Sequence, residues 1–159
     1  KKGTLTMSFD INAFLSASVT EPISDKAPQV PTGRYMARVA DLSDGKGVET
    51  WITAPSGNQK SPRLAVPFVI VDEGVQRAMG RTTPPTKSQS FFLNVDSANH
   101  LDPKNNAAFG QLLAALKIGG SNPGEIFSKL PGAGPLYITI APDKKDDQYT
   151  RVVKFEAAA

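Results

Sequence analysis

Apolar residues recur at every second position in short runs, and this alternation constrains the fold of the chain more than any other feature. The strongest predicted strand covers residues 63–71, where Leu64, Val66, Phe68 and Ile70 fall on one side of an extended chain. Pro67 lies on the other side, which predicts an edge strand or a bulge because proline donates no hydrogen bond. Similar runs cover residues 33–42, 48–53, 88–95, 136–140 and 150–155.

The segments between these runs are rich in turn-forming residues. The chain has 13 glycines and 13 prolines among 159 residues, which favours many short strands over long helices. Helical spacing occurs mainly from Ala108 to Leu116, after an Asp102–Pro103 start. A shorter helical turn is expected over 123–130, and residues 72–87 are predicted to be a polar connection between strands.

The order of these elements is one long bent strand, two further strands, a helix and two more strands. This order favours a mostly β fold, a five-stranded Greek-key barrel of the OB-fold type with a helix between strands 3 and 4. Gly45 and Gly47 interrupt the first strand where such a barrel has to bend. If residues 48–53 form a strand of their own, the alternative is an α+β fold with a six-stranded sheet.

The chain divides into an N-terminal extension and one domain. We expect the extension to cover residues 1–31, the domain 32–156 and a short tail 157–159, because 159 residues suit a single domain. Residues 1–6 precede Met7 and are expected to be a remnant ahead of the native start.

Two parts of the extension have different characters. Residues 8–17 favour a short helical arm capped by Ser8 or Asp10, whereas three prolines mark residues 18–31 as a linker. A homo-oligomer that forms through this segment is one partner hypothesis. The apolar side chains of the arm that need a docking surface are Phe9, Phe14 and Leu15.

Composition excludes several kinds of chemistry. The chain has no cysteine and one histidine, which excludes disulfides, a thiol nucleophile and cysteine-ligated metal sites. No phosphate-binding loop motif occurs, and His100 lies in a polar stretch that offers no general acid–base pair. We therefore expect a protein that is not an enzyme and needs no cofactor. The longest apolar runs fall far short of about 18 residues, so no membrane partner is expected.

The positive charge of the chain is concentrated in its first half. Residues 26–87 hold nine basic and five acidic side chains, an excess of four, while the whole chain carries a net charge of +3. Binding of single strands needs cations along the phosphates and flat rings on which bases stack. The candidate residues for such binding are Trp51, Phe92, Tyr35, Arg34, Arg38, Lys46, Lys60, Arg63, Arg77, Arg81 and Lys87.

Each of these candidates also has a structural interpretation. Trp51 alternates with Glu49 and Thr53, which places it toward solvent, toward a subunit interface or beneath the 72–87 connection. Phe92 lies on the face opposite Phe91, where it is open to solvent or covered by an extra helix. The basic residues are either a phosphate track or the scattered charge of an ordinary surface.

Four apolar and glycine patterns give the chain a family resemblance. They are residues 8–15, 30–39, 109–119 and 151–157. With these patterns the chain resembles small bacteriophage proteins of the DUF669 type. The resemblance implies a single-stranded DNA-binding protein with an OB-like fold, which coats strands during DNA replication and recombination in the cytoplasm of the infected bacterial host. The alternative hypothesis is an OB-like protein-interaction or virion-associated module that does not bind nucleic acid.

Overall fold

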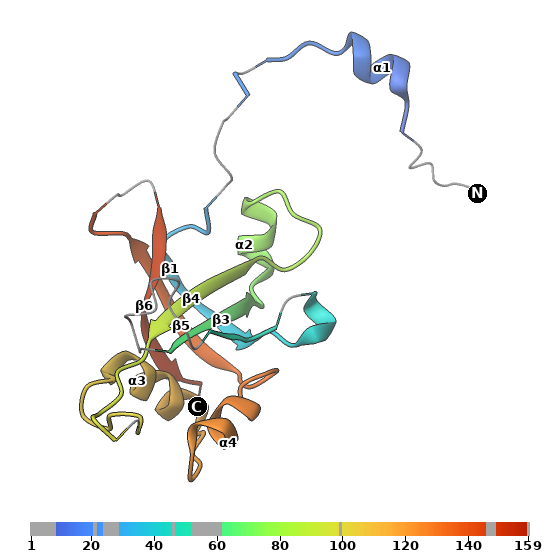
Figure 1. Ribbon diagram of the computed structural model, residues 1–159. Helices are drawn as coiled ribbons and strands as arrows, with labels where there is room; N and C mark the ends of the chain where they lie inside the picture. The colour runs from blue at the N-terminus through green and yellow to red at the C-terminus, as the bar shows by residue number, and fades with distance from the viewer. Residues whose placement is uncertain are drawn as a thin grey trace.

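One curled antiparallel sheet forms most of the domain (Figure 1). The computed structural model describes residues 9–20, 22–23, 29–45, 47–51, 62–98, 100–145 and 149–158. Within this part the fold is mostly β, as the alternating pattern predicts, and the sheet curls into a half-barrel with short helices at its two ends.

The sheet contains six strands. They are β1 (Gly33–Val39), β2 (Glu49–Trp51), β3 (Arg63–Ile70), β4 (Thr86–Phe92), β5 (Leu136–Pro142) and β6 (Thr150–Ala157). The helices are α1 (Ile11–Ser16), a 3₁₀ helix η1 (Leu42–Asp44), α2 (Glu73–Ala78), α3 (Ala107–Leu116) and α4 (Pro123–Ser128). β3 pairs with β4 along one edge and with β1 and β2 along the other, while β5 joins β1 to β6.

The segment predicted as one long bent strand is divided into two strands. β1 ends at Val39, and the short helix η1 follows. Gly45 caps the C-terminus of η1 and has the left-handed conformation, with φ of 89°. β1 then pairs with the C-terminal half of β3 and β2 with its N-terminal half. The two short strands thus occupy the positions along β3 that one bent strand would occupy. Because they are separate, the sheet has six strands and not the predicted five.

Pro67 lies neither on an edge strand nor at a register shift of the β3–β4 pairing, contrary to the sequence prediction of an edge or a bulge. It is buried in β3, which has neighbours on both sides. The Pro67 carbonyl accepts a hydrogen bond of 2.9 Å from Ala40, just beyond the end of β1 and before β2 begins to pair. Within a ladder, any other residue at this position would also donate its backbone N–H to the neighbouring strand. Because β1 has already ended at Val39, the lack of an N–H in proline is tolerated here.

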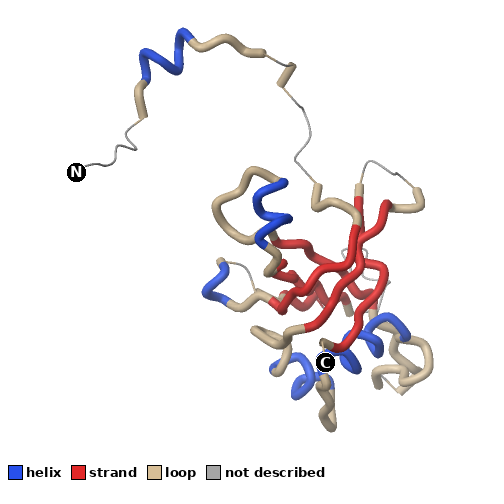
Figure 2. The backbone as a smooth tube through the Cα atoms, turned by 180° about the vertical axis from the view of Figure 1, so that it is seen from behind, coloured by secondary structure: helices blue, strands red, loops and turns tan. Residues whose placement is uncertain are grey.

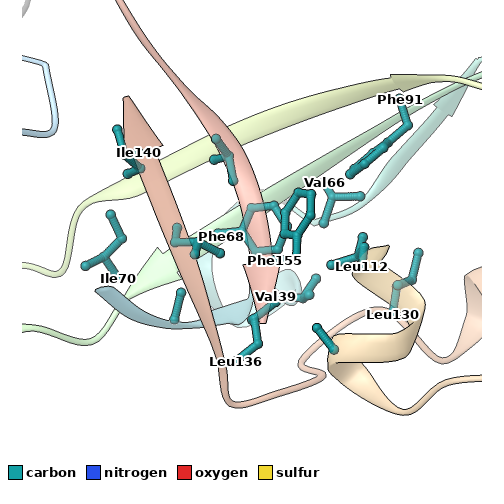
Figure 3. Close-up of a cluster of buried hydrophobic side chains, with 14 of the residues drawn as sticks. Val39, Val66, Phe68, Ile70, Phe91, Leu112, Leu130, Leu136, Ile140 and Phe155 are labelled. Carbon is teal, nitrogen blue, oxygen red and sulfur yellow. The ribbon is translucent and has the colours of Figure 1, made fainter. Parts of the chain in front are cut away.

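Phenylalanine rings hold the inner face of the sheet together (Figure 3). The Phe155 ring of β6 lies 5.5 Å from the ring of Phe68 in β3 and 5.8 Å from that of Phe91 in β4. Among the described strands, no hydrogen-bonded pairing joins β4 to β6. The contact between Phe91 and Phe155 therefore holds the two ends of the curled sheet together by apolar packing.

The helix α2 closes one end of the half-barrel, in the segment predicted to be a polar connection. Asp72 caps it by accepting hydrogen bonds from the backbone of Gly74 and Val75, and Val75 is buried in the core. The prediction failed because this six-residue helix buries a single apolar side chain, so no helical period is visible in the sequence.

The helices α3 and α4 cover the opposite end of the half-barrel (Figure 1). α3 begins at Ala107, later than the predicted Asp102–Pro103 start, because the Asp102 carboxylate accepts hydrogen bonds from Lys104 and Asn105 in a turn of its own. The buried residues of these two helices and of the following turn are Phe109, Leu112, Ala115 and Leu130.

The helix α1 stands apart from the sheet (Figure 2). Asp10 caps it, as predicted, while the alternative cap Ser8 lies outside the described residues. The Phe9 and Phe14 rings lie 5.4 Å apart, a contact between the residue before the cap and the fourth helical residue that stabilises the first turn. No residue of α1 is buried.

Replacing Phe155 with alanine should strongly destabilise the domain. The change removes a ring that contacts both β3 and β4, and we expect a loss of about 3–5 kcal/mol in the free energy of unfolding, measured with urea. The matched control is Phe92→Ala, whose ring is 64% exposed and whose loss should stay below about 0.5 kcal/mol. Equal losses in both variants would contradict the bridging role of Phe155.

Candidate nucleic-acid interface

Three of the predicted binding residues lie in one row across neighbouring strands. The backbone register pairs Arg63 of β3 with Trp51 of β2 on one side and with Phe92 of β4 on the other. The adjacent inner-face residues Leu64 and Phe91 are buried and form the next pair. Because successive side chains alternate between faces, Arg63 and Phe92 lie on the outer face of the half-barrel.

Arg63 and Phe92 form a cation–π pair on this face. The guanidinium carbon of Arg63 lies 5.6 Å from the centre of the Phe92 ring. Ser90 positions the guanidinium, because its hydroxyl accepts hydrogen bonds from Nη2 at 3.0 Å and from Nε at 3.3 Å. The alternative in which Phe92 is buried under an extra helix is wrong, since 64% of the residue is exposed. The side chain of Trp51 lies outside the described part of the structure.

A pocket of about 270 Å³ opens beside Phe92, between β4 and the first turn of α3. Three asparagines fasten these two elements together. The backbone of Asn94 donates to Asn106 Oδ1 at 2.8 Å, and Asn106 Nδ2 returns a hydrogen bond of 3.0 Å to the Asn94 carbonyl. Asn94 Nδ2 also donates to the carbonyl of Asn105. Our sequence reasoning missed this clamp, although asparagines cluster between the strand pattern and the helix pattern.

Arg38 and Asp44 form a separate, structural ion pair at the far end of β3. The two guanidinium nitrogens of Arg38 donate to the two carboxylate oxygens of Asp44 at 2.8 and 2.9 Å. These bonds, with a further one from the backbone of Asp41, lower the pKa of Asp44 to about 2. Arg38 therefore fixes η1 against β1, and its charge is already compensated.

Arg81 lies in the connection after α2, next to this ion pair. It lines a shallow hollow of about 330 Å³ together with Asp44 and Thr83, and it contacts the Thr83 hydroxyl at 3.5 Å. Thr86, the first residue of β4, lines the same hollow, which therefore lies at the opposite end of that strand from Phe92. We therefore place Arg81 outside the Arg63–Phe92 row.

Two predicted residues at the start of β1 make contacts within the fold. The guanidinium of Arg34 lies 3.9 Å from the centre of the Tyr137 ring and forms an ion pair of 2.9 Å with Glu156, which lowers the pKa of that carboxyl. The Tyr35 hydroxyl donates to the Pro31 carbonyl at 2.8 Å, and its ring packs against the core. Burial, with a smaller contribution from Asp72, raises the Tyr35 pKa. These contacts favour structural roles for both residues.

The remaining predicted cations are dispersed. Arg77 lies on α2, where it faces Glu73 at 3.8 Å. Lys87 of β4 is half-buried opposite Phe68, and burial lowers its pKa. Lys46 and Lys60 lie outside the described residues. The structure thus brings together Arg63, Phe92 and the backbone of Trp51, and it does not gather the other described candidates into the same patch.

No family model and no curated protein matches the chain.

The described residues form neither a metal-binding cluster nor a membrane-spanning helix. Within the described ranges, no group of three or more histidine, aspartate or glutamate side chains is arranged to hold a metal ion. None of the helices in this part of the chain is long and apolar enough to cross a membrane.

Replacing Asp44 with asparagine should change how stability depends on pH. Because folding lowers the Asp44 pKa, its carboxylate stabilises the folded state above the ordinary value of 3.8, and this contribution is lost as the pH falls toward about 2. We expect Asp44→Asn to be less stable than the unmodified protein at pH 7 and to lose less stability between pH 4 and pH 2, measured by urea unfolding. Arg38→Gln should have the same effect, and the double variant should add little. Fully additive effects would exclude the pairing as the cause.

Proposed function

We propose that the protein binds single-stranded DNA without catalysis, through the outer face of β2, β3 and β4. The observation that carries this proposal is the exposed Phe92 ring with the Arg63 guanidinium beside it. A flat exposed ring provides a stacking surface for a base, and a neighbouring guanidinium provides a cation for the phosphates. Trp51, in register with Arg63, would extend the row.

The strand pairing supports the finer fold proposal, an OB-like Greek-key barrel. Taken as one bent first strand, β1 and β2 pair with the second strand β3, and β1 pairs with the fourth strand β5. The remaining pairs join β3 to β4 and β5 to β6, and α3 follows the third strand along the chain. In OB-folds the second and third strands form the face that binds oligonucleotides. Here these strands are β3 and β4, which carry Arg63 and Phe92.

The chemistry of this face favours binding that is tolerant of sequence. A phenyl ring stacks on any base because every base has a π-face, and a guanidinium attracts any phosphate. Ser90 holds the Arg63 side chain, so less side-chain freedom is lost when a strand binds. The resemblance to bacteriophage proteins supports a role in coating strands during DNA replication and recombination in the infected bacterial host.

Binding should be visible in the fluorescence of Trp51, the one tryptophan of the chain. We expect oligo-dT to quench this fluorescence and the affinity to fall steeply as salt rises, because phosphate contacts release counterions. Phe92→Ala should weaken binding by about 1–3 kcal/mol at fixed salt. Arg63→Ala should reduce the salt slope by about 1.

The matched control is Arg77→Ala on α2, which removes the same charge from the end of the half-barrel away from Phe92. This variant should bind oligo-dT as the unmodified protein does, apart from the small effect of net charge. The absence of quenching and of any mobility shift at low salt would contradict the proposed function.

The exposed apolar surface of α1 favours a second candidate function, a protein-interaction module. Phe9, Phe14 and Leu15 are 70%, 62% and 71% exposed, and a helix of six residues is marginal in water unless it docks. Such a helix would lay its apolar face into a groove of a sister subunit or of another protein.

Replacing Phe14 with serine in the full chain tests this second function. We expect light scattering to show an assembly larger than a monomer for the unmodified protein, and a smaller one for Phe14→Ser. Ser16→Ala, on the same helix, should leave the mass unchanged. A monomeric unmodified protein that binds no other protein would exclude an arm that assembles the molecule.

A further inference from the structure

The pocket beside Phe92 has an apolar base and a polar rim. Phe91 and Phe109, which are both buried and whose ring centres lie 5.7 Å apart, contribute to its lining. Side chains with polar groups, among them Gln89 and Ser90, complete the lining next to the exposed Phe92. A nucleobase combines apolar faces with polar edges, so its surface complements this lining.

The walls of the pocket are fixed before any ligand arrives. The Asn94–Asn106 hydrogen bonds join the end of β4 to the start of α3, and the contact between Phe91 and Phe109 joins the same two elements below. Binding to such a preformed site needs little reorganisation. The volume of about 270 Å³ lies below the range of about 300–1,000 Å³ that is usual for small-molecule sites, which favours one flat ring over a whole cofactor.

The polar side chains at the rim of the pocket differ in whether their hydrogen-bonding atoms are already used within the protein. Both amide atoms of Asn106 are engaged within the protein, and the Ser90 hydroxyl accepts from Arg63. The Gln89 amide nitrogen donates to the Ser90 carbonyl at 3.2 Å, and no described residue donates to the Gln89 amide oxygen. The same holds for Asn105, whose Nδ2 donates to Asp102 while no described residue donates to its Oδ1. The amide oxygens of Gln89 and Asn105 are therefore the rim groups left to bind the edge of a base.

We propose that this pocket receives one nucleobase of the bound strand, next to the base that stacks on Phe92. The proposal rests on the proposed binding of single-stranded DNA and adds a second base site to it. The strand then crosses the end of β4, with one base on the outer ring and its neighbour inserted between β4 and α3. The Arg63 guanidinium beside Phe92 binds the phosphate that joins them.

Filling the pocket with a leucine side chain tests this site. Ala108 lines the pocket, is exposed and lies in the first turn of α3, so Ala108→Leu should preserve the fold. The matched control is Ala114→Leu, which lies exposed on the same helix away from the pocket. We expect Ala108→Leu to weaken the binding of oligo-dT about tenfold, the contribution of roughly one base, and Ala114→Leu to leave it unchanged.

Ala108→Leu could weaken binding by excluding a base from the pocket or by obstructing the strand in general, and an oligonucleotide with abasic positions distinguishes these two effects. The unmodified protein should bind oligo-dT with alternate abasic positions more weakly, and on this probe Ala108→Leu should cause little further loss. If Ala108→Leu and Ala114→Leu bind oligo-dT equally well while Phe92→Ala binds weakly, the pocket site is wrong and the proposed function stands. If the unmodified protein binds neither probe, both are wrong.

Discussion

The packing of Phe155 between Phe68 and Phe91 is the interaction on which the curled sheet depends. Hydrogen bonds hold each pair of neighbouring strands, but among the described residues none joins β4 to β6 in a ladder. Apolar packing inside the curl keeps these strands together, and the outer face of β4 takes its curvature from that packing. The binding face that we propose is therefore shaped by residues that no ligand touches.

Local patterns predicted most of the strands and the main helix, because each depends on residues close together in the sequence. The side chains from Leu64 to Ile70 that were assigned to one face of β3 are buried, although Pro67 and Val69 on its other face are buried as well. Phe91 and Phe92 were assigned to opposite faces of β4, and only Phe91 is buried. The position of Pro67 was predicted wrongly because a proline is tolerated inside β3 only where β1 stops pairing with it. That depends on a contact between segments far apart in the chain. α2 was missed because it buries only Val75. Its capping residue Asp72 is visible in the sequence, but one apolar residue gives no helical period.

The candidate site was harder to predict than the fold. Sequence could identify exposed aromatic and basic residues, but it could not show which cations are already paired. Arg38 binds Asp44, six residues along the chain, whereas Arg34 binds Glu156, which lies 122 positions away. Arg63 lies beside Phe92 because the strand register places them opposite each other. The asparagine clamp likewise joins a strand end to a helix start that single-sequence patterns treat separately.

The register of the sheet also has a consequence for how the molecule reaches its native state. The connection between β3 and β4 contains α2, and the pairing of these strands joins residues at most 29 positions apart, such as Arg63 and Phe92. The pairing of β1 with β5 joins residues about a hundred positions apart, such as Gly33 and Ile140. Distant pairs of this kind form slowly, because a long loop has to close before they are stabilised. We therefore expect the face that we assign to DNA to pair before the β1–β5 half of the sheet that supports it.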